Sequence, residues 1–219
     1  MKNVIDLKLG DTQTRLIGDP HQGRTYRAGV PLHRRGEREQ MNREAFEDAL
    51  LNLPEETEMV VIVGDIFDKF VVDPGTLLFV YGCLAQAFAQ RPDVRFIVLR
   101  GNHDASRDAS LRSSFDVLVA LLQEAGGIEF ATEDPYDVKV GDDEFGFIPW
   151  HPFVTAADMV KDLEEDHYTA IFGHWDIESF GGDDHNLIPT KELAEFTQTV
   201  ITGHVHQRQE FDRDGVHVL

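Results

Sequence analysis

Five short groups of histidine and acidic residues constrain this chain most strongly, because each follows an apolar run that is typical of a buried strand. Glycine opens four of the groups, where the backbone can turn sharply as a strand ends. The carboxyl ends of neighbouring parallel strands meet at one edge of a sheet, so side chains there converge. The groups are Asp19-Pro20-His21, Gly64-Asp65-Ile66-Phe67-Asp68, Gly101-Asn102-His103-Asp104, Gly173-His174 and Gly203-His204-Val205-His206. Together they predict one metal site assembled from several strand ends.

The segments between these groups alternate between helical and strand patterns, which predicts an α/β fold. Apolar spacing and the placement of Pro and Gly predict helices at residues 41–53, 74–90, 111–124, 155–165 and 191–196. Strands are expected at 59–63, 95–99, 169–172 and 199–202, with hairpins at 4–17, at 136–148 and around Asp214-Gly215. The 219 residues suit a single domain, 1–219, and the last hairpin ends so abruptly that we expect a truncation at the C-terminus.

Composition limits the partners and the compartment. A formal charge of -20 disfavours non-specific adhesion to nucleic acid or anionic membranes, although a locally basic groove can override the overall sign. The single cysteine, Cys83, cannot form an intrachain disulfide and sits in an apolar run, which favours a buried thiol in a reducing compartment. The chain has no signal-peptide pattern and no apolar stretch of about 18 residues, so we expect a cytoplasmic protein without a membrane span.

The donor types in the five groups suit one kind of chemistry. A divalent metal that activates water needs carboxylate oxygens, imidazole nitrogens and an amide carbonyl, with coordination positions left open. Each group alone is more often a surface turn, and only their joint order indicates a site. The other histidines lack the strand-end context, so we expect surface or packing roles for His33, His151, His167, His185 and His217.

The order DxH, GDxxD, GNHD, GH and GHxH resembles the calcineurin-like metallophosphoesterase superfamily, and the motifs span nearly the whole chain. The resemblance implies a four-layer β-sandwich flanked by helices, with the metal site at strand ends. It also implies two divalent metal ions. One would be bound by Asp19, His21, Asp65 and His206, and the other by Asp65, Asn102, His174 and His204. Asp65 would then bridge the two ions.

The same resemblance implies the roles of three further residues. Two metal ions at roughly 3.5–4 Å can hold a bridging hydroxide as nucleophile and neutralise phosphoryl oxygens. His103 would supply a proton or a positive charge to the leaving oxygen. Asp104 would orient His103 by a hydrogen bond, and Asp68 would support the metal ligands or brace the loop.

Differences between the motifs of this chain and those of particular branches of the superfamily point to a subtype. Protein serine/threonine phosphatases would carry GDxVDRG and GNHE, whereas this chain has Gly64-Asp65-Ile66-Phe67-Asp68-Lys69 and Asp104. GDIFD, Ile148-Pro149-Trp150 and Gly173-His174-Trp175 resemble SbcD-type nuclease subunits, especially the phage recombination endonuclease subunit. That likeness implies Mn²⁺, with Fe²⁺ and Zn²⁺ as alternatives, DNA as substrate and an SbcC-like SMC-type ATPase as partner. The capping and ATPase-docking regions of such subunits do not appear by residue 219, and a homodimer stays open.

A basic segment follows the first group and gives an independent indication. Its only acidic residues are Glu37 and Glu39, so its formal charge is +4 in a chain that is otherwise -24. Arginines beside a metal cleft can neutralise a nucleic-acid backbone, and the alternative is a solvated loop that pairs with acidic surface. The candidate substrate-binding residues are Arg24, Arg27, Arg34 and Arg35, followed by Arg38 and Arg43.

Three functions therefore compete. The leading hypothesis is a metal-dependent DNA exonuclease or endonuclease. The second is a phosphodiesterase or phosphatase for a nucleotide or another small phosphoester. The third is a metal-free scaffold, which the complete set of candidate ligands argues against.

Overall fold

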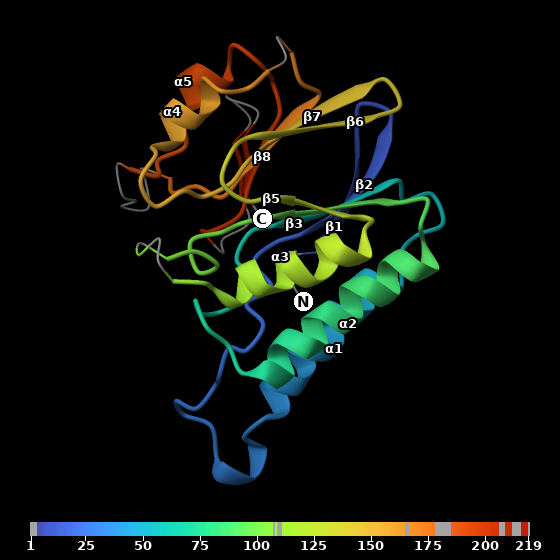
Figure 1. Ribbon diagram of the computed structural model, residues 1–219, viewed down its shortest axis with the longest axis vertical. Helices are drawn as coiled ribbons and strands as arrows, with labels where there is room; N and C mark the ends of the chain where they lie inside the picture. The colour runs from blue at the N-terminus through green and yellow to red at the C-terminus, as the bar shows by residue number, and fades with distance from the viewer. Residues whose placement is uncertain are drawn as a thin grey trace.

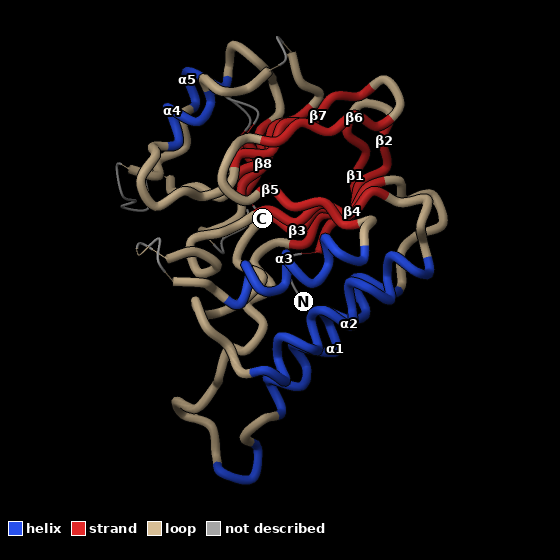
Figure 2. Tube along the Cα trace, in the orientation of Figure 1, coloured by secondary structure: helices blue, strands red, loops and turns tan. Residues whose placement is uncertain are grey.

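The computed structural model describes residues 4–106, 108, 111–164, 167–177, 185–205, 209–211 and 216–218. Two β-sheets face each other, and helices cover the outer face of each sheet (Figure 1, Figure 2). The layers therefore run helix, sheet, sheet, helix. This arrangement agrees with the predicted four-layer α/β fold.

The first sheet has the strand order β1-β2-β3-β4-β5. Its bounds are β1 (Val4–Leu9), β2 (Thr12–Ile17), β3 (Met59–Val63), β4 (Arg95–Leu99) and β5 (Ile128–Ala131). β1 and β2 form the predicted antiparallel hairpin, and β2 to β5 are parallel. Because parallel strands share a direction, β2, β3 and β4 deliver their following residues to one edge.

Three helices pack on the outer face of this sheet: α1 (Glu37–Leu51), α2 (Pro74–Gln90) and α3 (Ser114–Ala125). Asp73 caps α2 by accepting a hydrogen bond from the Thr76 backbone N–H, and Pro74 supplies the fixed φ of a first helical residue. A short 3₁₀ turn, η1 (Leu32–Arg34), precedes α1. Apolar side chains of the helices and of β2 to β4 form the core between them, including Phe46, Val80, Leu84, Phe96 and Phe115.

The second sheet has the order β10-β11-β9-β8-β7-β6. Its bounds are β6 (Tyr136–Val140), β7 (Asp143–Ile148), β8 (Ala170–Gly173), β9 (Val200–Thr202), β10 (Gln209–Phe211) and β11 (Val216–Val218). The helices α4 (Ala156–Val160) and α5 (Thr190–Leu193) pack on its outer face. β7, β8 and β9 are parallel, so this sheet also gathers its carboxyl ends at one edge.

The inner faces of the two sheets bury a second apolar core between them. Phe147 and Phe172 stack there with ring centroids 4.8 Å apart. Every residue of β3 is buried, as expected for a strand with packing on both faces. Because the two sheets pack closely, the edges at their carboxyl ends are held in a fixed position relative to each other.

Four helices and one strand differ from the predictions, and among them α5 ends at Leu193 and not at residue 196. α1 begins four residues earlier, where Glu37 and Glu39 favour the positive helix N-terminus. α3 begins at Ser114, because Ser113 and Asp116 form a reciprocal capping box. α4 ends at Val160, ahead of an acidic run that opposes a helix C-terminus. β5 was not predicted, since its four residues carry no clear alternation. No helix in the described part of the chain is long and apolar enough to cross a membrane.

Candidate metal centre

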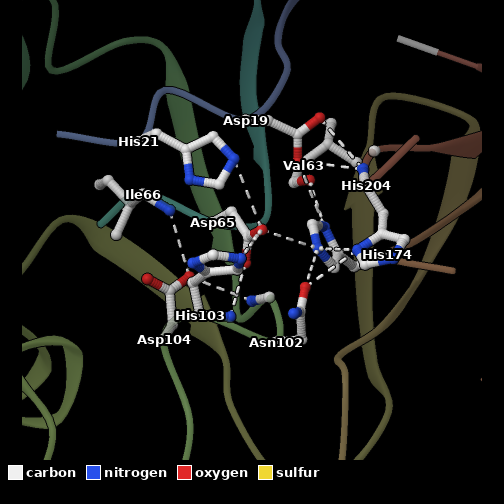
Figure 3. A network of polar contacts seen from close by, with 12 residues as sticks. Asp19, His21, Val63, Asp65, Ile66, Asn102, His103, Asp104, His174 and His204 are labelled. Atoms are coloured by element: carbon white, nitrogen blue, oxygen red, sulfur yellow. Dashed lines mark hydrogen bonds and ion pairs between the residues drawn. The ribbon is translucent and has the colours of Figure 1, made fainter. Parts of the chain in front are cut away.

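Six of the seven predicted ligands gather where the carboxyl ends of the two sheets meet (Figure 3). Asp19 follows β2, Asp65 follows β3, and Asn102 follows β4. From the second sheet, His174 follows β8 and His204 follows β9. Residues separated by up to 185 positions thus come into hydrogen-bonding distance, as in the bonds from the His204 N–H to both carboxylate oxygens of Asp19 at 3.0 Å.

The backbone is strained at the same positions. Among the described residues, the non-glycine residues with positive φ are Asp19 (42°), His21 (42°), Asp65 (46°) and His204 (85°). A positive φ is unfavourable for residues with a Cβ, and such residues cluster at functional sites where the fold over-determines them. All four are predicted metal ligands. The fold therefore holds these ligands in conformations that the sequence would not favour locally.

The glycines of the motifs serve mainly to let ligand loops approach each other. Only Gly64 has a positive φ, at 85°, so the predicted sharp turn applies there and not at Gly101, Gly173 or Gly203. A Cβ on Gly64 would overlap His174 Nδ1, and a Cβ on Gly101 would overlap the carboxylate and backbone nitrogen of Asp65. At Gly203 it would overlap the Val63 carbonyl. These positions exclude side chains because neighbouring ligands, or at Gly203 the backbone that holds His174, occupy the space.

Four donor atoms form one compact set. His174 Nε2 lies 3.3 Å from Asp65 Oδ2 and 3.0 Å from Asn102 Oδ1. His204 Nδ1 lies 2.9 Å from Asn102 Oδ1 and 3.3 Å from His174 Nε2. Ligand atoms that bind one cation at about 2.0–2.2 Å are separated from each other by about 3–3.6 Å. These four residues therefore fit a single divalent ion.

A second set shares Asp65 with the first. Asp19, His21 and Asp65 offer ligand atoms that all lie within 4.8 Å of one another, and His21 Nε2 is 3.7 Å from Asp65 Oδ2. All three side chains are buried. The fourth predicted ligand of this set, His206, lies outside the described residues. Asp65 stands between both sets, which is the position that a bridging carboxylate requires.

Two histidines are oriented by hydrogen bonds behind the site. Nδ1 of His174 donates to the Val63 carbonyl at 3.1 Å, so Nε2 faces the other ligands. Nε2 of His204 lies 2.7 Å from Asp176 Oδ1, so Nδ1 faces them instead. Such partners fix the tautomer and ring orientation of metal-binding histidines. Asp176 was not predicted as a site residue, although an acidic residue two positions after a strand-end histidine could have indicated it.

Electrostatics also favour a cation here. Burial alone would lower the pKa of His174, but the carboxylates of Asp65 and Asp19 raise it to about 10. Burial raises the pKa of Asp19 to about 7, against the attraction of His174. Burial opposes the ionisation of Asp65 as well, yet His174 and His21 hold its pKa below the ordinary value. The buried carboxylates thus demand a positive charge, which the His174 proton provides and a metal cation would provide more strongly.

His103 stands at the open side of the cluster. Its Nδ1 donates to the Asp68 carbonyl at 2.6 Å, because a carbonyl can only accept, so Nε2 is directed toward Asp65 Oδ2 at 4.0 Å. The side chain is 41% exposed, unlike the buried ligands, so a substrate can reach it. Its backbone N–H donates to Asp65 Oδ1 at 2.8 Å. His103 is therefore tied to the centre while its ring faces solvent.

Asp104 does not orient His103 as predicted. Its carboxylate accepts hydrogen bonds from the backbone N–H groups of Ile66 at 3.2 Å, Phe67 at 3.1 Å and Gly101 at 3.1 Å. Burial and the neighbouring Asp65 carboxylate raise the pKa of Asp104, and the N–H groups of Phe67 and Gly101 oppose that shift. The reason for the difference is that the loop after β3 has N–H groups without strand partners, and Asp104 satisfies them. Asp104 supports the loop that bears Asp65.

The basic segment begins at the edge of the cluster. Arg24 Nε lies 3.8 Å from Asp68 Oδ1, and Asp68 Oδ1 lies 3.7 Å from His21 Nδ1. The rest of the segment projects from the body between β2 and α1, drawn in blue at the lower end of Figure 1. Arg27, Arg34 and Arg35 are exposed, and Arg34 pairs with Glu37 at 2.8 Å. Only Arg24 of the four predicted substrate-binding arginines therefore has a contact with a residue of the centre.

Comparisons with known proteins complete the description of the site. No curated protein sequence matches the chain. Similar solved structures include a phosphopantetheinyl hydrolase from Mycobacterium tuberculosis, with 13% identity, a TM-score of 0.49 and coverage of 94% of this chain and 86% of that chain. A dimetal phosphatase from Danio rerio has 16% identity and a TM-score of 0.47, covering 94% and 85%. A nuclease MPE from Pseudomonas putida has 15% identity and a TM-score of 0.39, covering 95% and 76%.

A match to a protein-family model establishes the family of the chain. The model described as calcineurin-like phosphoesterase matches residues 14–208, which include the five motif groups. The family hydrolyses phosphoesters at a dimetal site, and the structure brings candidate ligand groups together at that place. The chain belongs to the calcineurin-like phosphoesterase family.

Proposed function

We propose that this protein is a metal-dependent phosphodiester hydrolase that cleaves DNA, as a nuclease subunit of SbcD type. The contact between Arg24 and Asp68, 3.8 Å apart, carries this proposal because it joins the basic segment to the candidate metal centre. A strand bound along the arginines would have a phosphate beside the centre. Arg contacts to phosphates supply much of the sequence-independent affinity for DNA.

Two metal ions bound by the two ligand sets would activate water and neutralise charge on the phosphoryl oxygens. The residues of the chain hold the ligand groups in fixed positions. Asp65, shared between the sets, fixes their separation, while the Val63 carbonyl and Asp176 hold the rings of His174 and His204 in one orientation. Little reorganisation is then needed when a substrate binds.

His103 would supply a proton to the leaving oxygen. The Asp68 carbonyl keeps the Nδ1 proton in place, so Nε2 is the nitrogen that can exchange a proton with the substrate. In its protonated form, Nε2–H would donate to the oxygen that leaves the phosphorus. The exposed ring is accessible to a DNA strand without a change in the buried ligands.

The motif likeness extends the proposal to the metal and the partner. Mn²⁺ would be the working metal on the basis of the motif likeness, because carboxylate, imidazole and amide donors suit Mn, Fe and Zn ions alike. An SbcC-like SMC-type ATPase would be the partner subunit, and the cytoplasm would be the compartment.

Digestion of end-labelled linear duplex and single-stranded DNA with Mn²⁺ tests the proposal. The wild type should release labelled products, and His103→Ala should lower turnover by about 10²–10⁴-fold, the usual contribution of a positioned acid or base. Metal content measured by elemental analysis should be unchanged in that variant. The matched control is His167→Ala, because His167 is exposed and outside the site.

Two results would contradict the proposal. Full activity of His103→Ala would remove the assigned role of His103. Turnover of a small phosphodiester without DNA cleavage at any Mn²⁺ concentration, with the ATPase added as well, would replace DNA by a small phosphoester as substrate.

A further inference from the structure

A cavity of about 220 Å³ lies beside the catalytic loop and is not used by the proposed chemistry. One wall comes from the segment after β4, with Arg100, Ser106 and Arg112. The other comes from the segment after β7, with His151 and Phe153, and Glu133 also lines it. Ligand pockets usually span roughly 300–1,000 Å³, so this cavity suits a group smaller than a whole nucleotide.

The cavity is joined to the metal centre through the backbone. Arg100 directly precedes the Gly101-Asn102-His103 loop, and its carbonyl accepts a hydrogen bond from the Trp150 N–H at 2.9 Å. That bond holds the segment after β7 against the segment that carries Asn102 and His103. A group bound in the cavity would therefore lie beside the loop that carries two residues of the centre, Asn102 and His103.

Arg100 presents hydrogen-bond donors to the cavity. The residue is only 6% exposed, and its guanidinium carries five N–H donors. Within the described part of the chain, its guanidinium makes one hydrogen bond from Nε to the Trp150 carbonyl at 3.3 Å and an ion pair with Glu133 at 4.0 Å. A buried guanidinium with so few acceptors retains N–H groups for a ligand in the cavity that it lines.

His151 offers a second, fixed donor. Its Nδ1 accepts hydrogen bonds from the backbone N–H groups of Phe153 at 3.1 Å and Val154 at 2.9 Å. Nδ1 must therefore be the unprotonated nitrogen, and Nε2 carries the proton. Burial and the nearby Arg100 lower the pKa of His151, which keeps the ring neutral near pH 7. The packing role expected from the sequence is present, and it also sets the tautomer of a donor beside the cavity.

Phe153 adds a flat apolar surface. It is 61% exposed, which is unusual for such a large apolar side chain, and its ring lies edge-on to His151 with centroids 5.9 Å apart. Leu111, on the opposite segment, is 52% exposed and lines the same cavity. Exposed apolar side chains beside polar donors are typical of a ligand site.

The charge of the lining argues for a neutral ligand. Arg100 and Arg112 are outnumbered by the carboxylates of Asp108, Asp116 and Glu133. A free phosphate would meet three like charges, whereas a heterocyclic base offers both acceptors for the guanidinium and donors for the carboxylates. Its flat face can also stack on an aromatic ring.

We propose that this cavity is a nucleobase subsite, which takes the unstacked base of a nucleotide next to the phosphate that is cleaved. The inference rests on the proposed function and deepens it. Because a base must leave its stack to enter the cavity, the enzyme should prefer single-stranded or frayed DNA to intact duplex.

Small esters test the subsite without DNA. The substrates are the 5′- and 3′-p-nitrophenyl phosphates of thymidine, compared with methyl p-nitrophenyl phosphate, which has no base. At least one thymidine ester should have a kcat/KM about 10-fold or more above that of the methyl ester, the scale of one stacked base. Phe153→Ala should abolish this advantage and leave hydrolysis of the methyl ester unchanged. Val154→Ala, an exposed neighbour outside the cavity lining, should behave as the wild type.

The outcomes separate the two proposals. If the wild type shows no advantage for either thymidine ester, or if Phe153→Ala slows all three esters equally, the subsite is wrong. If the esters show the advantage but no DNA is cut, the subsite stands and the DNA function fails. If no ester is hydrolysed, calorimetric titration with thymidine 5′-monophosphate tests the subsite by binding alone. The Phe153→Ala variant should bind this nucleotide about 10-fold more weakly than the wild type does. Absence of wild-type binding would exclude the subsite.

Discussion

Asp176 accepts the Nε2 proton of His204 over 2.7 Å, and this contact turns Nδ1 of His204 toward Asn102 Oδ1 at 2.9 Å. The two residues lie in different strand-end loops, after β8 and after β9. The contact therefore both chooses the ring nitrogen that faces the centre and ties two loops of the second sheet together.

Asp176→Asn should weaken metal binding by about 10–100-fold, because loss of the carboxylate leaves the His204 tautomer and ring orientation unfixed. Calorimetric titration of the metal-depleted protein with Mn²⁺ measures the change. Asp162→Asn removes the same charge from an exposed position and should leave the affinity unchanged. Equal affinities of the wild type and Asp176→Asn would show that the contact does not matter for the metal.

Gly64→Ala should destabilise the protein and reduce its metal content. The added Cβ would overlap His174 Nδ1, and an alanine at φ 85° costs about 1–2 kcal/mol by itself. The control is Gly82→Ala, since Gly82 lies inside α2 with nothing within 4 Å of an added Cβ. That variant should instead be more stable by about 0.5–1 kcal/mol. Thermal unfolding and elemental analysis of both variants provide the comparison, and a stable, metal-replete Gly64→Ala would be inconsistent with the crowded site.

Metal affinity should rise with pH. His174, with a pKa raised to about 10, carries a proton at neutral pH that must leave when a metal binds Nε2. Asp19, with a pKa raised to about 7, adds a second proton only below that pH. Metal binding should release about two protons near pH ~6 and about one near pH ~8.5. Calorimetry in buffers of different ionisation enthalpy counts these protons, and an affinity that is independent of pH would rule out the protonated His174.

Asp104→Asn should lower the free energy of unfolding by about 1–3 kcal/mol. The carboxylate serves three backbone N–H donors, and an amide offers only one oxygen and places its NH₂ group against another donor. Urea denaturation measures the loss. Asp142→Asn, at an exposed turn, should be neutral. If the Asp104 variant is as stable as its control, the loop after β3 does not depend on this carboxylate.

Arg24→Ala should reduce the salt dependence of DNA binding. Loss of one phosphate contact lowers the slope of log K against log salt concentration by about 0.7–0.9. Fluorescence anisotropy with labelled single-stranded DNA at several salt concentrations measures the slope. Lys139→Ala removes the same charge from β6, where the side chain is 64% exposed, and should leave the slope unchanged. Identical slopes for wild type and Arg24→Ala would place the DNA elsewhere.

The strands and helices with strong local signals were predictable. β3 and β4 agree with the prediction residue for residue, because uniform apolar runs bounded by polar residues have few alternatives. The start of α3 depends on the reciprocal hydrogen bonds of Ser113 and Asp116, which overrode the apolar Leu111 at the predicted start. β5 depends on pairing with β4 rather than on its own sequence, so its four residues gave no usable pattern.

The sequence by itself determined the donor types, their order and the fold class, because these follow from local patterns along the chain. Tertiary structure alone decided which atoms meet: the tautomer of His204 set by Asp176, the support of the Asp65 loop by Asp104, and the positive φ of Asp19, His21 and Asp65. Each of these features depends on contacts between residues distant in sequence, and local propensity opposes the strained conformations. The energy that maintains them comes from the two sheets packed against each other, which no short segment contains.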